Sequence, residues 1–162
     1  MIAARPSVGK TLFALNLALK QVQMGFKVAF FSMEMDNKEI VQRILARNSG
    51  LRLRAFRNKI EDNEKMEKVG KAMEELEVQL KTLYLFDNIY YKSKIERKIR
   101  RLKAKVNIDL VYIDYLGLIK GKANENKYQV VSEISRDLKQ LARELKITIV
   151  CLAQLNREME KR

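Results

Sequence analysis

The stretch Ala3-Ala4-Arg5-Pro6-Ser7-Val8-Gly9-Lys10-Thr11 decides which fold this sequence predicts. Its end matches the phosphate-binding pattern G-x-x-x-x-G-K-[ST], with Ala4 in the place of the first glycine. Backbone N–H groups in such a loop point at phosphate oxygens, and the following helix adds the positive end of its dipole. Gly9 lets the backbone approach closely, Lys10 can reach β- and γ-phosphates, and the Thr11 hydroxyl can ligate Mg²⁺. The alternative is a chance Gly-Lys-Thr at the start of a helix.

Composition narrows the class of protein. The chain has 162 residues, of which 47% are apolar, as expected for one globular domain. Its net charge of +13, from 33 basic and 20 acidic residues, favours a polyanionic partner such as nucleic acid over a merely soluble basic protein. The sequence contains no histidine, which excludes His-based metal sites and Ser-His-Asp triads. Any general base must therefore be a carboxylate.

The single cysteine and the lack of long apolar runs indicate in which cellular compartment to expect the protein. Cys151 lies inside an apolar run, so we expect a core thiol and not a nucleophile, and no intrachain disulfide is possible. No run reaches the roughly 20 apolar residues that span a bilayer, and the N-terminus leads directly into the loop without a signal peptide. These features predict a cytoplasmic protein.

Strands and helices are expected to alternate after the loop. Right-handed crossovers then build an α/β fold, a mostly parallel twisted sheet with helices on both faces. Only residues 1–3 precede the loop, so we expect the feeding strand to be cut short and the chain to be a fragment. The expected strands are 27–33, 82–86, 109–114 and 147–152, and the expected helices are 10–24, one after a capping box at Asp36 and Glu39, 62–80, 92–105 and one from Tyr128 to Leu145.

Two of the expected helices have informative faces. In 62–80, Met66, Val69, Met73, Leu76 and Leu80 form an amphipathic stripe, for which packing in the core is favoured over a partner-binding groove. The helix 92–105 is basic outside its apolar face. It could touch phosphates, but a solvated helix covering the sheet is the favoured interpretation.

Two strands end in an acid. Glu34 follows strand 27–33, and Asp114 ends strand 109–114. In open parallel sheets ligands bind at the carboxyl ends of strands. Four apolar residues running into Asp114 have the form of a Walker B element, whose carboxylate supports Mg²⁺. The alternative is a strand that ends in aspartate by chance.

Five blocks together resemble the C-terminal motor domain of DnaB-type replicative DNA helicases, which has a RecA-like fold. The blocks are Ala-Ala-Arg-Pro-Ser-Val-Gly-Lys-Thr (3–11), Phe-Ser-Met-Glu-Met (31–35), Ile-Asp-Tyr-Leu-Gly-Leu-Ile (113–119), Glu-Ile-Ser-Arg-Asp-Leu-Lys-Gln-Leu-Ala-Arg-Glu-Leu (133–145) and Gln-Leu-Asn-Arg (154–157). The likeness covers nearly the whole chain and is weakest at 51–61 and 88–94. Alanine at position 4 is the family's own variant of the loop.

The resemblance implies a role for each matching residue, with ATP and Mg²⁺ as cofactors. Glu34 would activate the attacking water, Lys10 would bind the β- and γ-phosphates, and Gln154 would sense the γ-phosphate. Thr11 and Asp114 would support Mg²⁺. The nucleotide-binding residues would be Arg5, Pro6, Ser7, Val8, Gly9, Lys10 and Thr11, and a loop facing DNA would supply Lys120, Lys122, Asn124 and Lys127.

The resemblance also implies an activity and partners for the full-length protein. It would be a hexameric, ATP-driven helicase that moves 5′→3′ on single-stranded DNA and meets a primase and a helicase loader. The whole chain would be one motor domain, without the N-terminal collar domain and without the arginine finger, which lies beyond 154–157 and serves a neighbouring subunit. Alone it would be a poor ATPase. A recombinase or RadA-like motor, and a DNA- or loader-binding module without turnover, remain alternatives.

Overall fold

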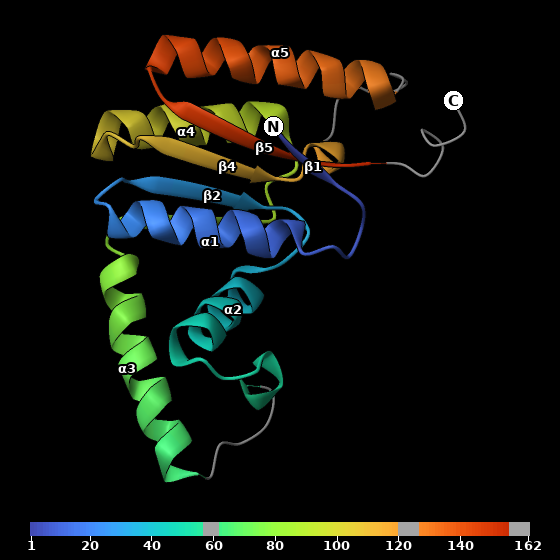
Figure 1. Cartoon of the computed structure of the whole chain (residues 1–162). Helices are drawn as coiled ribbons and strands as arrows, with labels where there is room; N and C mark the ends of the chain where they lie inside the picture. Colours follow the sequence, from blue (N-terminus) through green and yellow to red (C-terminus); the bar gives the residue numbers. More distant parts are fainter. Residues whose placement is uncertain (57–61, 120–126, 156–162) are drawn as a thin grey trace.

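The computed structural model describes residues 1–56, 62–119 and 127–155, except for the side chains of Lys127 and Tyr128. Figure 1 shows a sheet with helices on both faces, and α2 and α3 extending from one side. Among the helices of the described ranges, none is long and apolar enough to cross a membrane.

The described strands form one parallel sheet in the order β1-β5-β4-β2-β3. The mostly parallel sheet that the sequence predicts is thereby confirmed. The two central strands β2 and β4 are buried along their whole length, as expected for apolar strands covered on both faces. The strands are β1 (Ile2–Ala4), β2 (Val28–Ser32), β3 (Leu83–Asp87), β4 (Leu110–Asp114) and β5 (Thr148–Gln154).

The helices begin and end close to the residues that the sequence indicated. Asp36 caps α2, because its side chain accepts a hydrogen bond from the backbone N–H of Glu39 at 2.7 Å. The Glu39 carboxylate pairs with Arg43 at 2.8 Å and not with the Asp36 N–H. Only the Asp36 half of the predicted capping box is therefore confirmed. The α-helices are α1 (Lys10–Gln23), α2 (Asn37–Ser49), α3 (Asn63–Gln79), α4 (Lys92–Val106) and α5 (Lys127–Leu145), and the short 3₁₀ helices are η1 (Leu53–Phe56) and η2 (Leu116–Leu118).

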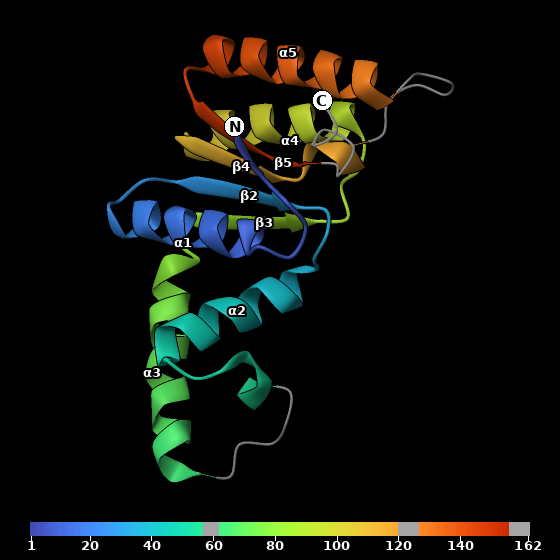
Figure 2. The ribbon, with the colours of Figure 1, turned by 45° about the vertical axis from the view of Figure 1, so that its right-hand side comes forward.

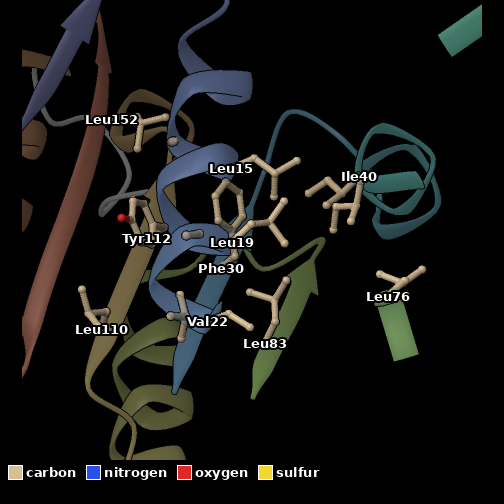
Figure 3. Packing of buried hydrophobic residues seen from close by; sticks show 14 residues of the cluster. Leu15, Leu19, Val22, Phe30, Ile40, Leu76, Leu83, Leu110, Tyr112 and Leu152 are labelled. Atoms are coloured by element: carbon tan, nitrogen blue, oxygen red, sulfur yellow. The ribbon is translucent and has the colours of Figure 1, made fainter. Parts of the chain in front are cut away.

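One apolar cluster lies on the face of the sheet that α1 covers. Figure 3 shows Leu15 and Leu19 of α1 against Phe30 and Tyr112 of the central strands. The Phe30 and Tyr112 rings stack with their centroids 5.7 Å apart. Ile40 of α2 joins this cluster, so α2 is anchored to α1 and the sheet. The cluster fixes the helix that follows the phosphate-binding loop.

A second cluster lies on the opposite face, under α4 and α5 (Figures 1 and 2). Ile95 and Ile99 of α4 and Ile134 and Leu138 of α5 are buried there. The two helices are also linked by ion pairs, because Lys92 contacts Asp137 and Glu133, while Arg100 pairs with Glu144. A helix covering the sheet, the favoured interpretation of the basic segment, is confirmed.

The prediction of a core stripe on α3 is wrong for most of its residues. Met66, Met73 and Leu80 are exposed, Val69 is half-buried, and only Leu76 is buried. The buried residues of α3 are Ala72, Leu76 and Gln79, so the contact face is rotated relative to the apolar stripe. Figure 2 shows the reason: α3 packs beside α2 and extends away from the sheet, which therefore covers little of its apolar face.

Candidate nucleotide-binding site

The loop from β1 to α1 lies at the carboxyl edge of the sheet. Gly9 adopts a left-handed conformation with φ of 86°, which favours glycine, and no atom lies within 4 Å of where its Cβ would be. Ser7 also has a positive φ, 63°. The Gly9 carbonyl accepts the first helical hydrogen bond, from Phe13 N at 2.9 Å. The loop therefore turns sharply and leaves an open backbone face in front of the N-terminus of α1.

Strand β4 brings Asp114 to this loop from a distant part of the sequence. Asp114 is fully buried, and its Oδ2 accepts a hydrogen bond from the Thr11 hydroxyl. Lys10 Nζ lies 3.7 Å from Asp114 Oδ1, and the Lys10 side chain is only 9% exposed. Asp114 Oδ1 is buried without a hydrogen-bond partner among the described residues. The predicted Walker A and Walker B residues are thus in direct contact.

Strand β2 places Glu34 at the same edge. Ser32 pairs with Asp114 in the parallel register, and Met33 N donates to the Asp114 carbonyl at 2.8 Å. Glu34 comes next along the chain and is exposed. The carboxylate therefore stands at solvent, beside the buried aspartate, where a water molecule has access to it.

A pocket of about 370 Å³ contains most of the predicted residues. Glu34, Lys10, Thr11 and Gln154 all line it, although Gln154 comes from the far end of the chain. Val8 does not belong to its wall and is 63% exposed, so among the loop residues expected at the nucleotide only the Val8 side chain points away. The full lining is Arg5, Pro6, Ser7, Gly9, Lys10, Thr11, Leu12, Glu34, Met35, Arg43 and Gln154.

Sequence reasoning missed two residues at this site. Arg43 of α2 lines the pocket, and its Nε is buried without a hydrogen-bond partner among the described residues. In the sequence, the one feature that points to Arg43 is its place as a basic residue next to apolar Ile44, on the helix that follows Glu34. Tyr115 presents its ring to Lys10, with Nζ 4.4 Å from the ring centroid. No spacing rule predicts this contact.

The predicted DNA-facing residues are not placed. Lys120, Lys122 and Asn124 lie outside the described residues, and Lys127 begins α5 without a described side chain. Their assignment stays a prediction. Cys151 on β5 is half-buried and packs against the second apolar cluster, so the predicted core position is confirmed only in part. Burial raises the pKa of its thiol to about 11.

The residues at the loop fit a magnesium ion bound together with phosphates. Mg²⁺ usually takes one or two protein ligands and fills its octahedron with water and phosphate oxygens. Asp114 offers a carboxylate in which one oxygen has no hydrogen-bond partner among the described residues, and Thr11 offers a hydroxyl beside that carboxylate. The described residues hold no cluster of three or more acidic, cysteine or histidine side chains that could form a purely protein-bound metal site.

A phosphate-binding loop, a buried strand-end aspartate and a parallel sheet define the class: a P-loop protein with a RecA-like fold. Within that class, the chain belongs to the DnaB-like helicase C-terminal domain family, whose model matches residues 1–162. The resemblance inferred from the sequence blocks is thereby confirmed.

Similar proteins and structures agree with this family. The chain is 40% identical to the replicative DNA helicase DnaB of Geobacillus stearothermophilus and 39% identical to the replicative DNA helicase DnaC of Bacillus subtilis (strain 168), covering all of this chain in both comparisons. It spans 36% of the length of each relative.

Two solved structures share the fold at 34% identity, over 99% of this chain. One is an ATPase domain, with a TM-score of 0.89 and 58% of that chain covered. The other is a DnaB-like replicative helicase described with its interactions with primase, with a TM-score of 0.90 and 39% covered.

Proposed function

We propose that this chain is the motor domain of a hexameric replicative DNA helicase, which couples ATP hydrolysis to 5′→3′ movement along single-stranded DNA and to duplex unwinding. The observation that carries the proposal is the contact of Lys10 and Thr11, which line a pocket together with Glu34 and Gln154, with Asp114 buried behind them. Family membership supplies the helicase context. The proposed setting is the cytoplasm, where DNA is replicated.

The side chains divide the work of hydrolysis. The loop N–H groups and Lys10 bind and orient the phosphates, because phosphoryl transfer depends mostly on positioning and on neutralising charge. Glu34, exposed at the end of β2, accepts a hydrogen bond from a water molecule and aligns it with the terminal phosphate. Gln154 reaches the pocket from β5 and reports the state of that phosphate.

Magnesium and the partner subunit complete the site. Thr11 and Asp114 would hold the ion, which neutralises phosphate charge when bound. An arginine from a neighbouring subunit would add transition-state stabilisation on the order of 10³–10⁵ in rate. The proposed partners are therefore further copies of the chain, single-stranded DNA, a primase and a helicase loader.

The direct test is Lys10→Ala in the full-length protein. We expect ATP turnover and unwinding to be lost, because the phosphates lose their principal side-chain cation. Lys20→Ala is the matched control, since Lys20 is an exposed lysine on the same helix. Turnover is measured with and without single-stranded DNA. A Lys10→Ala protein that unwinds DNA normally would contradict the proposal.

Glu34→Gln separates hydrolysis from binding. The amide keeps the size of the side chain but is a poor base, so we expect nucleotide binding to persist while turnover falls to near background. Equilibrium binding of a fluorescent ATP analogue and phosphate release measure the two quantities. Unchanged turnover would remove Glu34 from the proposed mechanism.

The assembly distinguishes the proposal from a recombinase or RadA-like motor. Electron microscopy of the full-length protein with nucleotide should show closed six-fold rings. Open filaments would favour the recombinase alternative, and nucleotide binding without DNA-stimulated turnover would favour a binding module.

A further inference from the structure

Lys10 is held from two sides. Its Nζ lies 3.7 Å from Asp114 Oδ1 and 4.4 Å from the centroid of the Tyr115 ring. A lysine ammonium over an aromatic face is attracted by the ring quadrupole, most strongly where water is excluded. The Lys10 side chain is only 9% exposed, so this contact is largely shielded from solvent. The last residue of β4, Asp114, and the residue after it, Tyr115, therefore define where the ammonium lies.

Neighbouring residues restrict the Tyr115 ring. It is half-buried and packs against the apolar cluster beneath α1. A Cβ at Gly117 would lie 2.8 Å from the ring atom Cε2. Gly117 does not have a positive φ, so the reason for glycine here is the close approach of the ring, which a side chain would force to shift. A ring fixed in this way can fix the position of the cation above it.

The Tyr115 phenol keeps its proton at neutral pH. Burial is the main cause that raises the pKa of its phenol, and the nearby carboxylates of Glu34 and Asp114 raise it further. The ring therefore faces Lys10 as an uncharged aromatic surface at neutral pH. Within the described part of the chain, Asp114 is the carboxylate that pairs with Lys10.

We propose that Tyr115 is a positioning residue for Lys10, and that its ring holds the ammonium where the β- and γ-phosphates of a nucleoside triphosphate bind. The inference rests on the proposed function of the site, because the proposed function is what makes a nucleoside triphosphate the ligand of Lys10. It also gives Gly117 a role, which is to leave room for the ring.

Tyr115 also borders a second cavity, of about 800 Å³, that lies beside the nucleotide pocket. Lys10 lines the nucleotide pocket and Tyr115 lines the second cavity, while Gln154 lines both. The residue that contacts Lys10 is therefore not itself part of the lining of the nucleotide pocket. The position of the phosphate-binding lysine is set partly by a residue outside the pocket wall itself.

The test measures affinity for a fluorescent ATP analogue in the full-length protein. Tyr115→Leu should weaken binding about 2- to 30-fold, the range expected for loss of one cation–π contact. Tyr115→Phe keeps the ring and should stay within about twofold of the wild type. Gly117→Ala should weaken binding in the same direction because it displaces the ring. Gly70→Ala is the matched control, since nothing lies within 4 Å of its Cβ position.

A second ligand distinguishes positioning from general damage. AMP has no β- or γ-phosphate, so its affinity, measured by competition, should be equal in Tyr115→Leu and wild type. The inference would be overturned if Tyr115→Leu lost the same factor of affinity for AMP as for the ATP analogue. It would also be overturned if Tyr115→Leu bound the ATP analogue as tightly as the wild type while Lys10→Ala bound it poorly. If the wild-type protein itself binds no ATP analogue, the proposed function fails.

Discussion

Helices α3 and α4 carry nearly the same apolar pattern and bury it to opposite extents. In α4, Ile95 and Ile99 are buried and Leu102 is half-buried, at spacings of four and three residues. The stripe of α3 repeats these spacings, yet Met66 is 53% and Met73 is 57% exposed. Periodicity thus shows that a helix has an apolar face, but it does not show whether anything covers that face.

The difference follows from what each helix rests on. Helix α4 lies on the sheet beside α5, so its apolar face meets Phe31 and Val111 of the central strands. Helix α3 leaves the sheet and packs along α2, whose narrower surface covers only the face formed by Ala72, Leu76 and Gln79 (Figure 2). Three substitutions test this comparison.

Ile99→Ala should have the largest effect. Ile99 is fully buried on the α4 side of the sheet, so removing its side chain loses burial and leaves a cavity. We expect the free energy of unfolding to fall by about 2–5 kcal/mol. Urea denaturation of the 162-residue chain measures it. A loss no larger than that of an exposed residue would mean that α4 is not anchored on the sheet as described.

Lys92→Met should have an intermediate effect, because it removes the ion pairs that join α4 to α5. Lys92 is partly exposed, so we expect a loss of about 0.5–1 kcal/mol at neutral pH and low salt. The hydrogen bond to Asp137 raises the pKa of Lys92 above its usual 10.5. A raised folded-state pKa means that this stabilisation is present at neutral pH and is lost as alkaline pH passes through the folded value.

The control for Lys92 is Arg101→Met. Arg101 is exposed on the same helix, and no acidic partner is found for it among the described residues. If both variants lose the same stability, and if salt has the same effect on both, the ion pairs of Lys92 contribute nothing specific to the packing of α4 on α5.

Met73→Gln should have the smallest effect. Its side chain is already exposed on α3, and glutamine retains good helix propensity, so the free energy of unfolding should change by less than about 0.5 kcal/mol. The matched core control is Leu76→Gln, in the next turn of the same helix and on its buried face. A large loss in Met73→Gln would show that the apolar stripe of α3 is covered after all.

The parts of the site that depend on local sequence were predictable. Gly9, Lys10 and Thr11 follow a spacing fixed by phosphate geometry, and Glu34 and Asp114 end apolar runs that are typical of buried strands. Parallel pairing then brings strand ends to one edge, which predicts that they meet. The structure joins Thr11 and Asp114 by a hydrogen bond, and the roles of the site residues stay predictions.

The remaining parts depend on how helices cross and on which side chains face inward. Arg43 reaches the pocket because α2 is anchored on α1, and Tyr115 meets Lys10 because Gly117 leaves space for its ring. The wrong prediction for α3 has the same origin. The spacing of apolar residues in a sequence indicates which face of a helix is apolar, but it does not indicate which other element covers that face.

The strand order has a consequence for how the protein acquires its site. Among the described strands, β1, which leads into the phosphate-binding loop, pairs only with β5, so Ile2 finds its partner Leu152 far along the chain. Long-range parallel pairing is slow to form. During synthesis, β2, β3 and β4 can associate while the loop still lacks its anchoring partner. We expect nucleotide-binding competence to be acquired late, when the ribosome has released β5.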